Sequence, residues 1–366
     1  MKVLVTGANG FLGRHVVAAL LGRGHAVRAL VRPAASLEPL GWASTVEVVR
    51  ADLRAGALES LLLGVDAVVH LAAAVTGGED AQFAATVVGT ERLLAAMAQS
   101  SARRLVLASS FSVYDWSAVH GSLDEDSPLE VTPDLYERDG YAVAKSWQER
   151  ITRAAAKQQG WELVVLRPGW IWGPEHSYLA GLGQRLGQVH LVFGPGTHLP
   201  LTYVENCADL FAVCVDAPAA ADRTFNVVDT DDVRIWRYLG DHLRRKGEAG
   251  LRIPIPYALG YAVARLAQST SRFIFDGKGK LPGVLIPCRF EARFKPLRFP
   301  GEKARTELGW VPPFSYESCL DRTYGRPGEP LQAEGLVSLP GREGTEAAPA
   351  PAAAGRAPVS TGAAAP

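Results

Sequence analysis

Short apolar runs alternate with helix-like stretches along the first half of this 366-residue chain. The runs are rich in β-branched residues and lack polar alternation, a pattern typical of strands buried on both faces of a sheet. They occupy residues 3–5, 26–31, 46–49, 67–71, 105–109 and 163–166. Between them lie stretches of helical periodicity, at 13–22, 57–63, 81–99 and 141–159. Strict alternation of strand and helix predicts an α/β fold with a doubly wound parallel sheet and right-handed crossovers.

The alternation loosens after Pro168, and this change predicts how the chain is divided. Gly, Pro and aromatic residues crowd 170–203, which indicates loops and small elements, whereas a helix over 206–216 and a strand over 224–228 look like one more unit of the sheet. The last part of the chain is rich in Ala, Pro and Gly and has too little apolar area to offset its ordering entropy. The predicted parts are a sheet domain (1–168 with 204–229), a smaller substrate lobe (169–203 and 230–326) and a disordered tail (327–366).

Composition narrows the class of protein. Lys plus Arg (38) balances Asp plus Glu (38), so no global field favours nucleic acid or an anionic membrane. The four cysteines are widely spaced and form no CxxC pair, so we expect reduced packing residues and no metal site. The chain lacks both a run of about 18 apolar residues and the apolar stretch of a signal peptide. These features predict a cytoplasmic enzyme or binding protein without a membrane span.

Three glycines, Gly7, Gly10 and Gly13, follow the first strand and open the first helix. Without side chains they allow a tight turn and a close approach of backbone to phosphate, while the helix N-terminus offers free N–H groups. The GxxGxxG spacing is one residue wider than the standard dinucleotide fingerprint, and such glycines could merely pack helix on strand. Their place in a strand–turn–helix unit favours a Rossmann dinucleotide site. The residues expected at the cofactor pyrophosphate are Gly7, Asn9, Gly10, Phe11, Leu12 and Gly13.

The end of the second strand bears on the choice between NAD and NADP. An acidic residue there would accept hydrogen bonds from the adenine ribose and favour NAD, but the sequence has Arg32 instead. Arg32, helped by Arg14 and Arg28, could pair with a 2′-phosphate in a charge-assisted fork. A solvated arginine at a strand end is the alternative. NADP is therefore favoured and NAD stays open.

The third and fourth strands end in residues suited to the rest of the cofactor. Asp52, followed by Leu53, can accept a hydrogen bond from the adenine amine at the end of the third strand. His70 ends the fourth strand, and we expect it to be structural. The small residues after it let the backbone pass close to the cofactor, and the expected contacts there are Leu71, Ala72 and Ala73.

The fifth strand and the helix after it carry groups suited to proton transfer. Ser110 closes the strand, and Tyr141 and Lys145 are spaced i, i+4 on one helical face. A free tyrosine has a pKa of about 10 and is a poor base near neutral pH. A nearby ammonium and an oxidised nicotinamide lower that pKa, while a serine can hold the reacting oxygen and the lysine can bind ribose hydroxyls. These residues predict hydride chemistry assisted by the protein.

The motifs in this order resemble the extended short-chain dehydrogenase/reductase superfamily, of the NAD-dependent epimerase/dehydratase type. The resemblance spans about residues 1–325 and includes LRPG (166–169), WGP (172–174), TYV (202–204) and ARTELGWVP (304–312). The stretches 10–15 and 301–305 look most like 3β-hydroxysteroid dehydrogenases and dihydroflavonol reductases. The resemblance implies that Ser110, Tyr141 and Lys145 are catalytic and that Pro168 lines the nicotinamide pocket. It also implies a homodimer through helices beginning near Ala81 and Tyr141.

Two features depart from the family pattern. Thr86 stands where the family usually has Asn, whose side chain organises polar groups below the active site, so the proton relay is less certain here. The stretch from Asp115 to Gly140 is long and contains an acidic turn at 124–128. We expect most of this stretch to overhang the pocket, and Asp124 and Glu125 to be solvated rather than catalytic acids.

Other residues bear on the substrate. Aromatic residues that could line an apolar pocket, or serve as core, are Trp170, Trp172, His176, Tyr178 and Tyr203. Arginines available to clamp a diphosphate are Arg185, Arg289 and Arg293, although no spacing selects them. The apolar stretch 255–267 is expected to be a helix buried in the lobe, although contact with a membrane surface or partner is an alternative.

The prediction is an NADP- or NAD-dependent oxidoreductase that interconverts a secondary alcohol and a ketone, on a bulky apolar substrate such as a steroid or flavonoid. An NAD(P)-dependent sugar-nucleotide epimerase or dehydratase is the alternative, because it would use the same groups. A cofactor-sensing binding protein should lack the catalytic trio, which this chain keeps.

Overall fold

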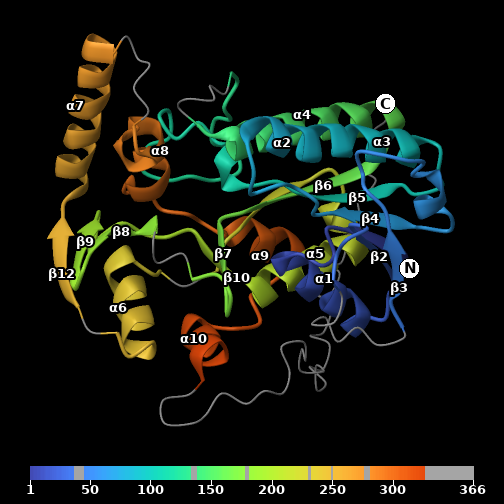
Figure 1. The fold of residues 1–366 in the computed structure, drawn as a ribbon. Coiled ribbons are helices and arrows are strands. Elements are labelled where there is room, and N and C mark those ends of the chain that lie inside the picture. The colour runs from blue at the N-terminus through green and yellow to red at the C-terminus, as the bar shows by residue number, and fades with distance from the viewer. Residues whose placement is uncertain are drawn as a thin grey trace, which may run out of the picture.

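A seven-stranded parallel sheet forms the centre of the computed structural model, which describes residues 1–36, 45–132, 138–177, 181–229, 232–248, 250–275 and 281–325 (Figure 1). The strand order is β11-β6-β5-β4-β1-β2-β3. This order confirms the doubly wound prediction, because the chain winds outward in both directions from the neighbours β1 and β4. The bounds are β1 (Lys2–Thr6), β2 (Ala26–Val31), β3 (Glu47–Arg50), β4 (Ala67–His70), β5 (Arg104–Ala108), β6 (Glu162–Pro168) and β11 (Thr224–Val227).

Helices cover both faces of the sheet, as its buried apolar strands require (Figure 1). The edge strand β3 is the exception: it was expected to be buried on both faces, but it is mostly exposed because it has a neighbouring strand on one side only. One core cluster joins α1 (Phe11–Gly22) and α5 (Val204–Asp216) to the sheet. A second cluster lies under the other helical layer. That layer is formed by α2 (Glu79–Phe83), the π-helical segment η3 (Ala84–Val88), α3 (Gly89–Ala98) and α4 (Gly140–Gln159).

Most of the rest of the chain forms small elements beside the carboxyl edge of the large sheet, whereas residues 302–308 pack against β11. This part of the chain includes two small sheets, one that pairs β10 with β7 and one with the strand order β12-β9-β8. The strands are β7 (Trp170–Trp172), β8 (Gly183–Leu186), β9 (Val189–Phe193), β10 (Leu201–Tyr203) and β12 (Leu251–Ile255). The helices are α6 (Ile235–Arg245), α7 (Tyr257–Phe275), α8 (Pro287–Phe294), α9 (Glu302–Leu308) and α10 (Tyr316–Tyr324). The proposed division between sheet domain and lobe stays a prediction, and the tail from residue 327 lies outside the described residues.

Some predicted elements differ in kind from those observed. The expected helix over 57–63 is a short 3-10 segment, η2 (Glu59–Leu62), because Gly64 at φ 68° turns the chain toward β4. The helix expected over 81–99 is interrupted by the π-helical segment η3. Single 3-10 turns also occur at η4 (Phe111–Val113), η6 (Pro218–Ala220) and η7 (Gly283–Leu285). Among the described residues, no helix is long and apolar enough to cross a membrane.

Candidate active site

The candidate site lies where the winding direction of the sheet reverses, between β1 and β4. Thr6 and His70 pair across the ends of these strands, and Thr6 Oγ1 lies 2.7 Å from His70 Nδ1. The same oxygen accepts the backbone N–H groups of Leu71 and Ala72, each at 3.2 Å. The two strand ends are thereby held together. In doubly wound sheets this crevice is the usual ligand site.

The glycine turn after β1 has no room for side chains. Gly7 has φ 67°, and a Cβ on it would lie 3.0 Å from the backbone nitrogen of Ala72. A Cβ on Gly13 would lie only 2.1 Å from the carbonyl oxygen of Gly7, whereas one on Gly10 would lie 3.1 Å from it. The turn is therefore close-packed against β4 and α1, and glycine at position 13 is a steric requirement.

The start of α1 fits a dinucleotide pyrophosphate. Its cap residue is Gly10, and no side chain among the described residues caps this helix end. The N–H groups of the first turn, including those of Phe11 and Leu12, lack intrahelical acceptors by geometry and lie at the positive end of the helix dipole. Asn9 is partly exposed beside them. The sequence and the structure thus place free donors where an anion would lie.

The adenine end has two of its expected side chains in place. Arg32 is exposed just after β2. Asp52 accepts hydrogen bonds from the side chain and backbone N–H of Arg54, which lower the pKa of its carboxyl to about 2. Leu53 is buried under α3, and its carbonyl oxygen accepts from Arg92 at 3.0 Å. Asp52 is thus charged at neutral pH, and the side chain of Leu53 belongs to the core.

Arg28 cannot help to bind a 2′-phosphate, so that expectation is wrong. Its guanidinium is buried on the face of β2 that packs under η2, where it donates to the carbonyl oxygens of Leu61 and Leu63 and pairs with Glu47 at 2.9 Å. Arg14 is also engaged, in an ion pair with Glu175 at 2.5 Å. Of the three arginines, only Arg32 is exposed at the strand end.

The residues expected to be catalytic come from β5 and α4, and a buried hydrogen bond connects these elements. The Nζ atom of Lys145 donates to the carbonyl oxygen of Ala108, the last residue of β5, at 2.7 Å. Ser110 follows two residues later and caps η4 by accepting the N–H of Ser112 at 3.1 Å. Tyr141 is half-buried and lies one helical turn before Lys145. The Nζ atom of Lys145 lies 6.0 Å from the centre of the Tyr141 ring. The fold thus brings Ser110, Tyr141 and Lys145 to one edge of the sheet.

Gln148 holds the ammonium of Lys145 from the other side, and the sequence reasoning missed it. Its Oε1 accepts from Nζ at 2.8 Å, so the ammonium has two acceptors in the protein interior. Burial lowers the pKa of Lys145 to about 7, although the charge of Glu149 acts in the opposite direction. A glutamine three residues after the lysine was the available signal, since i and i+3 lie on the same helical face.

Gln148 connects Lys145 to a buried chain of polar groups under the cofactor crevice. Its Nε2 donates to Thr90 Oγ1 at 2.9 Å, and that hydroxyl donates to the carbonyl oxygen of Thr86 at 2.5 Å. With its proton committed to Thr86, the Thr90 hydroxyl accepts from His70 Nε2 at 2.8 Å, so His70 carries its proton on Nε2. Burial also lowers the pKa of His70 to about 3, so the ring is neutral and structural, as we expected.

Thr86, which stands where the motif resemblance implies an asparagine, contributes to the polar chain through its backbone. Thr86 lies within η3, where its side-chain oxygen accepts the N–H of Ala74 at 3.1 Å. Its carbonyl oxygen is turned to the Thr90 hydroxyl. The π-helical segment therefore places backbone, rather than a side-chain amide, in the polar chain.

A second buried network supports the serine end of the site. Ser109 donates to Glu149 Oε2 at 2.5 Å, and the guanidinium of Arg167 binds both carboxylate oxygens of Glu149, the shorter contact being 2.6 Å. Burial raises the pKa of Glu149, but the hydrogen bond and charge of Arg167 outweigh it and leave the value at about 2. A charged carboxylate therefore fixes Ser109, the neighbour of Ser110.

This network also binds the acidic turn, which corrects one expectation. Glu125 is partly buried rather than solvated, and its Oε1 accepts the backbone N–H of Asn226 at 2.7 Å. Burial raises the pKa of Glu125. Tyr114 connects the turn to the network, because its hydroxyl donates to Asn226 Oδ1 at 2.6 Å and accepts from Arg167 at 3.0 Å. Asp124 instead accepts from Ser127 within the turn itself at 3.0 Å.

The aromatic residues considered for the pocket separate into different places. Trp172 and Tyr203 are fully buried and their rings lie 5.1 Å apart in the third core cluster, so they do not line a pocket. Trp170 packs partly buried against that cluster. His176 instead lies against Phe11 at the start of α1, with ring centres 4.3 Å apart. Tyr178 lies outside the described residues.

The arginines considered as a diphosphate clamp do not act as one set. Arg185 is on β8 and pairs with Glu248 at 2.9 Å. Arg289 and Arg293 are on consecutive turns of α8. Burial lowers the pKa of Arg293, with the charge of Asp139 raising it and that of Arg289 lowering it further. Arg293 therefore interacts electrostatically with both Arg289 and Asp139, and Asp139 lies two residues before Tyr141.

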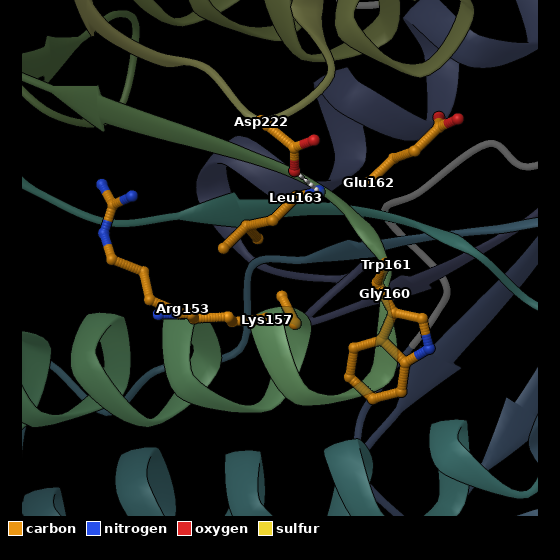
Figure 2. Close-up of a pocket in the computed structure, with 8 residues that line it drawn as sticks. Arg153, Lys157, Gly160, Trp161, Glu162, Leu163 and Asp222 are labelled. Atoms are coloured by element: carbon orange, nitrogen blue, oxygen red, sulfur yellow. Dashed lines mark hydrogen bonds between the residues drawn. The ribbon is translucent and has the colours of Figure 1, made fainter.

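A groove of about 440 Å³ lies elsewhere, at the opposite end of β6 from Pro168. Figure 2 shows it between the last turns of α4, which contribute Arg153 and Lys157, and the start of β6 at Glu162. Parallel strands present their ligand sites at their carboxyl ends. This groove is therefore no part of the candidate active site.

The family model for the NAD dependent epimerase/dehydratase family matches residues 3–227. The chain belongs to this family. The enzyme is therefore an NAD(P)-dependent dehydrogenase, reductase or epimerase of the extended short-chain dehydrogenase type, which confirms the resemblance read from its motifs. All of the cofactor turn, β4 and the Ser–Tyr–Lys positions fall within the matched residues.

Relatives of this epimerase/dehydratase-family enzyme differ in what they act on. It is 27% identical to a 4-hydroxy-2-methyl-3-oxo-4-farnesyl-3,4-dihydroquinoline-1-oxide ketoreductase of Stigmatella aurantiaca, over 88% of this chain and 95% of the relative. It is 29% identical to a 3 beta-hydroxysteroid dehydrogenase/Delta 5→4-isomerase of Mycobacterium tuberculosis, over 87% and 88%. The UDP-glucuronic acid 4-epimerase of Bacillus cereus, solved with NAD, shares its fold with a TM-score of 0.65 at 21% identity, over 88% and 97%.

Proposed function

We propose that this enzyme interconverts a secondary alcohol and a ketone on a bulky apolar substrate, with Tyr141 as the acid/base group. The observation that carries the proposal is the anchoring of Lys145 to Ala108 and Gln148, which fixes an ammonium one helical turn from Tyr141. Ser110 lies two residues beyond Ala108 on the same strand end. The arrangement provides a proton donor, a charge that favours phenolate and a hydroxyl for the reacting oxygen.

The protein groups would work in the following way. Ser110 donates a hydrogen bond to the substrate oxygen and orients it toward Tyr141. In the oxidation direction the Tyr141 phenolate takes the hydroxyl proton, and in reduction the phenol gives it back. Lys145 stabilises the phenolate, because a nearby positive charge lowers the pKa of a phenol. A bound nicotinamide supplies hydride exchange with the substrate carbon.

The proposed cofactor is NADP, with NAD as the alternative, held along the crevice between β1 and β4. Arg32 would pair with a 2′-phosphate, and Asp52 would accept from the adenine amine. The glycine turn supports this assignment, since Gly7 and Gly13 have no room for a Cβ and the backbone N–H groups at the start of α1 are not capped by any described side chain. The proposed contacts are Gly7, Asn9, Gly10, Phe11, Leu12, Gly13, Arg32, Asp52, Leu53, Leu71, Ala72, Ala73, Tyr141, Lys145 and Pro168.

Support for an apolar substrate comes from the relatives. The Stigmatella ketoreductase is named for a farnesyl-bearing quinoline oxide, and the mycobacterial dehydrogenase for a 3β-hydroxysteroid. Both align over nearly nine-tenths of this chain, including the lobe beyond residue 230.

A sugar-nucleotide epimerase or dehydratase is the second candidate. It is favoured by Arg289 and Arg293, which lie in one electrostatic environment with Asp139 near the start of α4. Two arginines on consecutive turns of one helix could bind a diphosphate. Arg185, which pairs with Glu248, does not join them.

A cytoplasmic homodimer through the helical segment α2–η3–α3 and through α4 is part of the proposal. Exposed apolar side chains along this helical layer support it, including Phe83, Val88 and Trp147. Burying such residues against a second copy would use area that is otherwise in water.

The test compares the turnover of wild type and Tyr141→Phe. Turnover is measured as the absorbance of reduced nicotinamide, with hydroxysteroids, flavanols and sugar nucleotides as substrates. We expect net reduction of NADP⁺ with one alcohol class, and loss of turnover in Tyr141→Phe with unchanged cofactor affinity. Unchanged turnover in the variant would refute the role of Tyr141. Conversion of a sugar nucleotide without net reduction would instead select the second candidate.

A further inference from the structure

Helix α7 packs on the lobe through one face only. Gly260 lies so close to Phe290 of α8 that a Cβ on it would be 2.5 Å from the ring. Ala264, one turn on, is fully buried, and the stacked rings of Tyr257 and Tyr261 lie 5.6 Å apart on the same side. This face holds α7 against α8.

The opposite face of α7 is apolar and exposed, so the expectation of a helix buried in the lobe is wrong. Figure 1 shows the helix standing out from the sheet beside α8. The exposed apolar side chains are Leu259 (55% exposed), Val263 (49%), Leu266 (68%), Phe273 (90%) and Ile274 (61%). With 3.6 residues per turn, all five fall within an arc of about 100°. We call these five residues the α7 stripe.

The two charged residues of α7 itself are both arginines. Arg265 and Arg272, two turns apart, are exposed on one flank of the stripe. Residues 250–275 also contain Arg252 and no aspartate or glutamate, and the next charged residues along the chain are Asp276, Lys278 and Lys280. A helix with an exposed apolar face and arginines as its only charges suits the interface of an anionic bilayer, where its axis lies in the membrane plane.

The same charges argue against a second copy of this helix as the occupant. Two α7 stripes packed together would bring the arginine flanks of both helices near each other, and residues 257–275 supply no acidic side chain to offset the repulsion between the two flanks. Membrane insertion across the bilayer does not fit either, because α7 is not apolar enough for a span. An anionic bilayer offers an apolar interior for the side chains of the stripe and negative headgroups for the arginines on its flank.

We propose that the α7 stripe docks this enzyme on the surface of an anionic lipid membrane. The apolar side chains enter the acyl boundary, and Arg265 and Arg272 bind lipid phosphates or carboxylates. Since α7 rests on α8, docking brings the lobe to the bilayer. The proposal goes beyond the catalytic activity and does not depend on the substrate.

The experiment is flotation of the full chain with vesicles of phosphatidylcholine alone and with about one-third phosphatidylserine. The first variant, Leu259→Ser/Val263→Ser/Leu266→Ser, changes only exposed side chains of the stripe. The second, Arg265→Glu/Arg272→Glu, reverses the flank. The matched control, Leu63→Ser/Val311→Ser, removes exposed apolar side chains (69% and 61% exposed) far from α7. Circular dichroism and turnover check that each variant is folded.

We expect wild type and control to float with the anionic vesicles and both α7 variants to stay with the soluble fraction. Each arginine near an anionic surface contributes about fivefold in partitioning, so reversing two should weaken binding by at least roughly 25-fold. Failure of wild type to float would overturn the proposal, as would flotation of the stripe variant. A wild-type dimer that the stripe variant converts to monomers, without vesicle binding, would assign the stripe to a second copy and also overturn it.

Discussion

Replacing Gln148 with leucine removes one of the two acceptors that hold the ammonium of Lys145 in the protein interior. A hydrogen bond to a charged group is worth about 1.5–3 kcal/mol, which corresponds to roughly one to two pKa units. The pKa of Lys145, already lowered by burial to about 7, should fall by that amount in Gln148→Leu. The charged form would then be lost at lower pH than in wild type.

The rate should follow the charged fraction of Lys145, because the ammonium stabilises the Tyr141 phenolate. Well above both pKa values that fraction is inversely proportional to the acid dissociation constant, so the rate falls by roughly 10- to 100-fold. Well below both values Lys145 is charged in either protein, and the two rates should converge. The predicted signature is thus a pH profile whose high-pH limb is shifted by one to two units toward lower pH.

The assay is the pH profile of kcat with saturating cofactor and a substrate alcohol. Gln148→Glu serves as the matched control, since a carboxylate retains the acceptor and adds a charge that raises the pKa of Lys145. The high-pH limb of Gln148→Glu should shift toward higher pH, in the direction opposite to that of Gln148→Leu. Thermal unfolding shows whether either variant is damaged. Equal losses of rate at every pH, or no loss at all, would refute the reasoning.

Three further results are expected. Glu149→Gln should lower the free energy of unfolding by about 3–5 kcal/mol, measured in urea, because the buried Arg167 loses its charge partner, and a smaller cost in an Arg167→Met background would show that the pair is responsible. For wild type this stabilisation is present above the ordinary glutamate pKa and fades as the pH falls toward about 2, so an unchanged difference between wild type and variant at pH 3 would contradict it. Gly13→Ala should weaken cofactor binding and stability far more than Gly10→Ala, since its Cβ would lie 2.1 Å rather than 3.1 Å from the turn carbonyl, and calorimetric titration would show equal losses if the steric argument fails. Arg32→Ala should weaken NADP binding by roughly 10- to 100-fold and leave NAD binding unchanged, whereas equal effects on both cofactors would remove the proposed 2′-phosphate contact.

Local pattern was enough for much of the fold. Buried parallel strands need apolar runs on both faces, and helices need a 3.6-residue period, so the sheet elements could be predicted within a few residues. The glycine turn and the Tyr141–Lys145 spacing are also local, because they depend on sterics within a turn and on the pitch of one helix. Sequence alone therefore determined the fold class, the crevice and the helix that carries the proposed acid/base pair.

Partners of charged and aromatic side chains were decided by tertiary structure. Arg28 lies within β2 and is buried beside Glu47 under η2, whereas Arg32 follows the last residue of β2 and is exposed. Glu125 is bound by the backbone of Asn226, about a hundred residues away, which no local pattern reveals.

The two largest corrections have the same physical origin. Trp172 and Tyr203 are of residue types that often line a pocket, but they pack in a core. The apolar stretch of α7 has the composition of a core helix, but one face of it is exposed. The apolar character of a side chain indicates only that its removal from water lowers the free energy. Which surface covers it depends on the packing of the whole chain, and for α7 the described chain covers only one face.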